Sequence, residues 1–179
     1  MIGGFGGQGI LLLGKILTYA GMLEDKEVTW FPSYGGEMRG GTANCAVVIS
    51  DELIASPVVT SPDILIVMND ASLKKFQPML KKRGILIFDS SLIKSPDLRS
   101  DIDALGVPAT EISSLIGYTR SANMVLIGVL IAKTGLLTES SVFEALENSI
   151  AHGRNSIEMN KIAIKKGIKF FEDKKSKDI

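Results

Sequence analysis

The segment Asp63–Phe88, DILIVMNDASLKKFQPMLKKRGILIF, decides the fold class of this chain. Its first six residues form a nearly continuous apolar run, which is typical of a strand buried on both faces. Asn69-Asp70 then predicts the start of a helix over residues 71–82, which Gly84 ends. Residues 85–88 repeat the pattern of a buried strand. The segment therefore predicts a β-α-β unit, whose two strands run parallel in one sheet.

The sequence on either side of this unit predicts an α/β protein. Residues 10–22 are apolar almost all round, which favours a helix packed closely on a sheet. Strands are expected at 27–31, ended by Pro32, and at 43–50. A turn at Asp51-Glu52 would pair the second of these strands with residues 53–55, as an antiparallel hairpin at the edge of the sheet. A short helix and a strand at 107–110 are expected between Pro96 and Thr110, followed by helices at 122–134, 139–151 and 156–171.

This order of elements predicts a Rossmann-like layered sheet with helices on both faces, an antiparallel edge hairpin and a helical C-terminal part. At 179 residues the chain is expected to form a single domain, 1–179. Lysine plus arginine and aspartate plus glutamate number 20 each, so the charge balance gives no argument for nucleic acid or an anionic membrane.

The chain has one cysteine, Cys45, and one histidine, His152. One cysteine excludes an intrachain disulfide and a cluster held by several cysteines of this chain. Cys45 lies in an apolar stretch, which favours a buried core residue over a nucleophile. The N-terminus lacks the basic region of a signal peptide, and the apolar run 124–132 is too short to span a bilayer. We therefore expect a cytoplasmic protein.

The chain opens with the glycine run Gly3–Gly9, which contains Gly4-x-Gly6-x-x-Gly9, the spacing of a dinucleotide-binding loop. A dinucleotide site also needs an acidic residue at the end of the second strand, and Trp30–Ser33 supplies none. Only Met1 and Ile2 precede the glycines, so the first strand is either nearly absent or begins before this sequence. Two interpretations of the loop stay open: a tight turn for close packing, or a helix N-terminus that faces an anion.

A second glycine segment, Tyr34–Thr42 (YGGEMRGGT), has too many glycines for a stable helix or strand. Glu37 and Arg39 could pair with each other within an irregular loop. Alternatively, the backbone of this segment presses against a cofactor or another subunit while Arg39 binds an anion.

Together the two glycine segments resemble the γ subunits of 2-oxoacid:ferredoxin oxidoreductases. Pyruvate-type members carry the form Phe-Gly-x-Glu-Arg-Arg-Gly-Ala in the second loop, whereas Met38-Arg39-Gly40-Gly41-Thr42 resembles the 2-oxoglutarate or branched-chain (ketoisovalerate) type. Further landmarks of the resemblance occur in order along nearly the whole chain: Asn44-Cys45, Ile49–Asp51, Ser56-Pro57, Pro62-Asp63, Pro108–Glu111, Asn123–Gly128 and Glu158–Asn160.

The resemblance implies a complex that converts a 2-oxoacid, coenzyme A and ferredoxin to acyl-CoA, carbon dioxide and reduced ferredoxin. Thiamine diphosphate, magnesium and iron–sulfur clusters would then be held by the partner α, β and ferredoxin-like δ subunits, with no cofactor bound by this chain alone. This chain would be inactive by itself and have no catalytic residue of its own. Its expected cofactor-binding or interface residues are Gly4, Gly6, Gly7, Gln8, Gly9, Tyr34, Glu37, Arg39, Gly40, Gly41 and Thr42.

Two other functions remain open from the sequence: the homologous β subunit of an indolepyruvate:ferredoxin oxidoreductase, and a stand-alone nucleotide-binding protein. Asn123 begins an apolar helix, which favours a capping role over a ligand-binding one. We expect the two glycine loops to lie together at the carboxyl edge of the sheet, where open α/β folds bind ligands.

Overall fold

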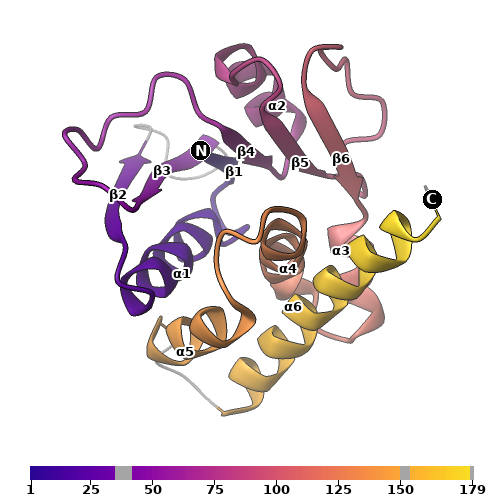
Figure 1. Cartoon of the computed structure of the whole chain (residues 1–179). Helices are drawn as coiled ribbons and strands as arrows, with labels where there is room; N and C mark the ends of the chain where they lie inside the picture. Colours follow the sequence, from indigo (N-terminus) through magenta and orange to yellow (C-terminus); the bar gives the residue numbers. More distant parts are fainter. Residues whose placement is uncertain (35–41, 150–153, 178–179) are drawn as a thin grey trace.

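A single mixed sheet organises the molecule (Figure 1). The structure, a computed structural model, describes residues 1–34, 42–149 and 154–177. Within these residues the sheet has six strands in the order β2-β3-β1-β4-β5-β6. Strands β1, β4, β5 and β6 are parallel, whereas β3 is antiparallel to both of its neighbours. The strands are β1 (Ile2–Phe5), β2 (Glu27–Tyr34), β3 (Thr42–Ser50), β4 (Ile64–Val67), β5 (Ile85–Asp89) and β6 (Asp103–Val107).

Helices cover both faces of the sheet, as the sequence predicts. Figure 1 shows α2 on one face and α1 and α4 on the other, with α6 across the outer side of α4. Helix α5 packs mainly on α1. None of the helices in the described ranges is both long enough and apolar enough to cross a membrane. The helices are α1 (Ile10–Leu23), α2 (Asp70–Phe76), α3 (Ala109–Leu115), α4 (Ala122–Thr134), α5 (Glu139–Ser149) and α6 (Arg154–Lys175).

Strand β4 is apolar along its whole length because it lies between two cores. Leu65 and Val67 pack in the smaller core beneath α2, while Ile66 packs in the larger core formed with α1 and α4. Successive side chains of a strand point to opposite faces, so a strand covered on both sides needs an apolar residue at every position. The β-α-β prediction from residues 63–88 is therefore confirmed for its strands.

The contact between α4 and α6 depends on a pair of glycines. Gly128 of α4 and Gly167 of α6 face each other across the helix crossing, where a β-carbon at either would lie 2.0 Å from a backbone oxygen of the other helix. Small residues let helix backbones approach closely, and nothing larger fits here without separating the helices. This contact fixes the position of α4 beneath the sheet.

The antiparallel edge of the sheet exists, but different strands form it. Strand β3 pairs with β2 along its length, and Leu53–Ala55 forms no strand, so the predicted hairpin partner was wrong. Pro32 does not end β2, which continues to Tyr34. The reason is that β2 is an edge strand, where a proline without an N–H costs the sheet no ladder bond on its open side.

Several other elements differ from the predictions. Helix α2 ends at Phe76, and Gln77–Met79 forms a 3-10 turn, because Pro78 cannot donate the next helical hydrogen bond. No helix forms over residues 95–100, and the strand predicted at 107–110 instead ends at Val107, where Pro108 leads into α3. The first strand is present as Ile2–Phe5, and it includes Gly3 and Gly4 of the glycine run.

Candidate functional site

The topology creates a crevice between the carboxyl ends of β1 and β4. These neighbouring strands are parallel, but β1 leads into α1 on one face of the sheet and β4 leads into α2 on the other (Figure 1). Chains that leave two adjacent strands in opposite directions open the space where α/β folds bind ligands. Here a cavity of about 730 Å³ lies at this point, lined by Phe5, Gln8, Met68, Asn69, Asp70, Ala71, Lys74 and Leu92.

The glycine loop, which contributes Phe5 and Gln8 to the lining of the crevice, requires glycine at two positions. Gly7 has a φ of 94° and Gly9 a φ of 73°, a region that other residues enter only with strain. Gly9 is the N-cap residue of α1 and offers no side chain to the first amides of that helix. Within the described residues those amides have no hydrogen-bond acceptor, and the partial positive charge of the helix end favours a negative group there.

Gln8 joins the two walls of the crevice. Its Oε1 accepts a hydrogen bond from the Phe5 amide at 2.6 Å, and its Nε2 donates to the Met68 carbonyl at 3.1 Å. A β-carbon at Gly4 would lie 2.8 Å from the same Oε1, so Gly4 leaves room for this side chain. Gln8 was predicted as a cofactor or interface residue, and the structure shows that its polar atoms hold the loop against β4.

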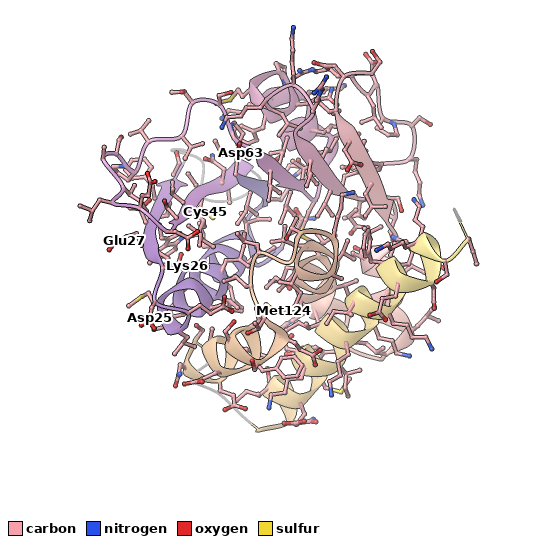
Figure 2. The ribbon with its side chains drawn as sticks, in the orientation of Figure 1. Asp25, Lys26, Glu27, Cys45, Asp63 and Met124 are labelled. Carbon is pink, nitrogen blue, oxygen red and sulfur yellow. The ribbon has the colours of Figure 1, made fainter. Side chains whose placement is uncertain are left out.

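Asn123 of α4 reaches the glycine loop from the other side. It is buried, and its Nδ2 donates to the Gly9 carbonyl at 3.1 Å. Asn123 is not the N-cap of α4, which is Ser121, but its Oδ1 accepts a hydrogen bond from the Met124 amide in the first turn at 3.1 Å, so the expected capping role is confirmed in part. The sequence signal was a lone amide at the start of a helix that is otherwise apolar on every face. Figure 2 labels its neighbour Met124 in the helical layer below the sheet.

The second glycine segment begins and ends at the same edge of the sheet. The backbone of Tyr34 pairs with Ala43, and Thr42 pairs with Phe5, which directly precedes the glycine loop. The two ends of the segment are thus anchored at the carboxyl end of β1, and the meeting of the two loops at this edge stays a prediction. Glu37, Arg39, Gly40 and Gly41 lie outside the described residues, so the contacts expected of them stay a prediction.

Two polar residues that sequence reasoning did not assign to the site also lie at this edge. Asn69 accepts a hydrogen bond from the Ser72 amide at 2.7 Å and so caps α2, as predicted. Asp89, at the end of β5, is fully buried and accepts hydrogen bonds from the Ser91 amide at 3.0 Å and from the Thr110 hydroxyl. Asp89 therefore fixes the start of α3 against the sheet.

Neither a reactive thiol nor a metal-binding cluster is found within the described ranges. Cys45 is fully buried between the sheet and α1, and burial raises the pKa of its thiol to about 11 (Figure 2). A thiol in this state is neither nucleophile nor metal ligand near neutral pH, which confirms the prediction of a core cysteine. The described residues contain no cluster of three or more histidine, cysteine or acidic side chains that could hold a metal ion.

The strand beside β1 argues against a dinucleotide at the glycine loop. In a dinucleotide fold the second strand lies next to the first and carries the ribose-binding acid at its end. Here β3 occupies that position, runs antiparallel to β1, and separates it from β2. The fold and site define an α/β protein with a switch-point glycine loop that lacks the ribose-binding position.

Sequence comparison identifies the family. The profile of the pyruvate ferredoxin/flavodoxin oxidoreductase family matches residues 1–170, and the chain belongs to this family. The ketoisovalerate oxidoreductase subunit VorA of Methanothermobacter thermautotrophicus is 42% identical over 161 residues, which cover 89% of this chain and 33% of VorA. The 2-oxoglutarate synthase subunit KorC of Methanocaldococcus jannaschii is 37% identical over 171 residues, or 93% of this chain and 89% of KorC. The chain thus spans about a third of the VorA length.

Solved structures share the fold. The γ subunit of a keto/oxoacid ferredoxin oxidoreductase from Geobacter sulfurreducens superposes with a TM-score of 0.79 at 27% identity, covering 96% of this chain and 94% of that one. A 2-oxoglutarate:ferredoxin oxidoreductase from Magnetococcus marinus gives a TM-score of 0.88 at 23% identity, covering 96% of this chain but 30% of that one. The second likeness concerns the fold alone.

Proposed function

We propose that this chain is the γ component of a 2-oxoacid:ferredoxin oxidoreductase and has no activity by itself. The observation that supports the proposal is that the first glycine segment and the two strand ends that flank the second, Tyr34 and Thr42, lie at the same edge of the sheet. Family membership and the names of the γ-type relatives support the same function. The proposed reaction oxidatively decarboxylates a 2-oxoacid with coenzyme A to acyl-CoA, carbon dioxide and reduced ferredoxin.

The cofactors of this reaction belong, on this proposal, to partner α, β and ferredoxin-like δ subunits. The sequence has one cysteine, which is buried, and the described residues offer no group of metal ligands, so they do not fit an iron–sulfur cluster or a magnesium site. Thiamine diphosphate would supply carbanion chemistry and the clusters electron transfer, each on a partner chain. We keep the sequence-based expectation of a cytoplasmic location.

The substrate we propose is 2-oxoglutarate, with a branched-chain 2-oxoacid as the second choice. The sequence of the second glycine segment resembles that of the 2-oxoglutarate and branched-chain members of the family. KorC and VorA relatives reach 38% and 42% identity, against 30% for a pyruvate/ketoisovalerate γ subunit of Thermococcus kodakarensis. An indolepyruvate-type or stand-alone nucleotide-binding function gains no support from these relatives.

The role we propose for the glycine segments is close contact with coenzyme A or with the neighbouring subunit. The free amides at the start of α1 suit a phosphate or carboxylate group. Arg39 is the proposed anion-binding side chain of the second segment, since its guanidinium can bind a phosphate in a bidentate manner. The Magnetococcus marinus enzyme of the same fold was solved with coenzyme A bound.

Purification of the complex from its native source tests this function. The chain should co-purify with thiamine-containing and cluster-containing subunits, and the complex should reduce ferredoxin with 2-oxoglutarate faster than with pyruvate or branched-chain 2-oxoacids. The Arg39→Ala variant should weaken assembly or raise the KM for coenzyme A, and Arg39→Lys should restore only part of it. A chain that purifies alone and binds NAD or FAD tightly as a monomer would overturn the proposal.

A further inference from the structure

The glycine loop is held in place by a side chain from a distant part of the sequence. Asn123 is 2% exposed, and its Nδ2 donates to the carbonyl of Gly9, which lies 114 residues earlier in the chain. The same carbonyl accepts the first helical hydrogen bond from Leu13 at 2.9 Å. Both lone pairs of the Gly9 oxygen are therefore in use, one within α1 and one from α4.

This hydrogen bond also fixes the direction of the first amide of α1. The Gly9 carbonyl and the Ile10 amide belong to one planar peptide group and point in opposite directions. Anchoring the oxygen therefore orients the Ile10 N–H, which has no acceptor within the described part of the chain. Ile10 is the first residue of α1, so its amide is one of the free donors at the helix start.

The fit between Gly9 and Asn123 leaves no space for a different arrangement. A β-carbon at Gly9 would lie 2.3 Å from the Asn123 Nδ2. Helix α4, which carries Asn123, is itself fixed by its close crossing with α6 at Gly128 and Gly167. The loop is thus held at Gln8 by the sheet and at Gly9 by the helical layer.

We infer that Asn123 is a positioning residue for the proposed contact surface: it sets the shape of the glycine loop and the direction of the free amide donors at the start of α1. Its effect passes through Gly9, and Asn123 itself touches neither ligand nor partner. The inference rests on the proposed function only for the consequence in the assembled enzyme. The shape of the loop is a property of this chain and can be measured without that function.

The first measurement compares Asn123→Leu with Ile127→Val by NMR of the ¹⁵N-labelled full chain. Leucine has the same branched shape, although it is larger, and has neither donor nor acceptor. Ile127 is a fully buried residue one turn further along the same helix. Asn123→Leu removes two hydrogen bonds, one to the Gly9 carbonyl and one from the Met124 amide, so it should lose more stability than Ile127→Val, and both variants are compared well below their melting temperatures. The amide resonances of Gly7, Gly9 and Ile10 should shift in Asn123→Leu and stay unchanged in Ile127→Val.

The second measurement places both variants in the assembled complex. Loss of one oriented donor should raise the KM for coenzyme A by about fivefold at nearly unchanged kcat, or weaken subunit assembly to a similar degree. Ile127→Val should do neither. If Asn123→Leu does not fold, Asn123→Ser, which keeps a hydroxyl donor, should give a smaller change in the same direction.

The two measurements test different claims, so each can be contradicted without the other. Unchanged loop resonances in Asn123→Leu, or equal changes in Ile127→Val, would overturn the positioning role. Shifted resonances with unchanged KM and assembly would leave the positioning role intact and refute the contact that the proposed function assigns to the loop.

Discussion

Replacement of Gly128 by alanine should destabilise the protein through the crossing of α4 and α6. A β-carbon at Gly128 would lie 2.0 Å from the Ile164 carbonyl oxygen, and one at Gly167 would lie 2.0 Å from that of Val125. Ordinary van der Waals contact begins at 3.4 Å. Both obstacles are backbone atoms of packed helices, so relief requires the helices to move apart by more than about 1 Å and opens gaps along the whole contact.

The expected loss combines two opposing effects. Alanine stabilises a helix by about 1 kcal/mol relative to glycine. Overpacking against backbone costs about 3 kcal/mol or more, because no side chain can rotate away. The net loss for Gly128→Ala is about 2–4 kcal/mol, which for a chain of this size corresponds to a melting temperature lower by about 10 °C.

Thermal unfolding followed by circular dichroism measures this loss, with Gly135→Ala as the control. Gly135 ends α4 with a φ of 62° and has open space around it, so alanine there costs only backbone strain of about 1 kcal/mol. The double variant Gly128→Ala/Gly167→Ala should lose less than the sum of its parts, because either methyl group separates the same helices. A Gly128→Ala protein as stable as the wild type would refute the close crossing.

Three other outcomes follow from single sites. Gly9→Ala should lower the melting temperature more than Gly7→Ala, since both glycines have positive φ but only the first would bring a β-carbon against Asn123; equal losses in thermal unfolding would contradict this. Partial loss of hydration raises the pKa of Glu24. Hydrogen bonds from hydroxyl and amide groups at the start of α5 outweigh this effect, so the pKa is lowered overall. The contribution of the Glu24 carboxylate to folding stability is therefore fully present above the ordinary carboxyl pKa and is lost as pH falls through the lowered pKa. On acidification, the urea midpoint should drop less in Glu24→Gln than in the wild type. Cys45 should resist thiol reagents until the protein unfolds, and rapid alkylation of the native protein would exclude the buried position. Because burial raises the pKa of its thiol from 9.0 to about 11, the contribution of Cys45 to stability should be lost as pH rises through that interval.

The sequence by itself determined the α/β class and the family. Continuous apolar strands and all-apolar helices follow from burial on two sides, a property that each segment carries in its own composition. The glycine runs likewise predicted residues with positive φ and a close approach of the backbone to other groups, and Gly7 and Gly9 confirm the positive φ. These inferences succeeded because they depend on local chemistry.

Only the tertiary structure decided which segments meet. Leu53–Ala55 was expected to pair with β3, but β2 takes that place, because strand pairing depends on which edge is open and not on the nearest turn. Asn123 was expected to cap its own helix, and its Oδ1 does accept from the Met124 amide there, but its Nδ2 also binds Gly9 across 114 residues. A side chain that reaches that far is invisible to any local pattern, since its partner is set by the packing of α4 on α6 and on the sheet.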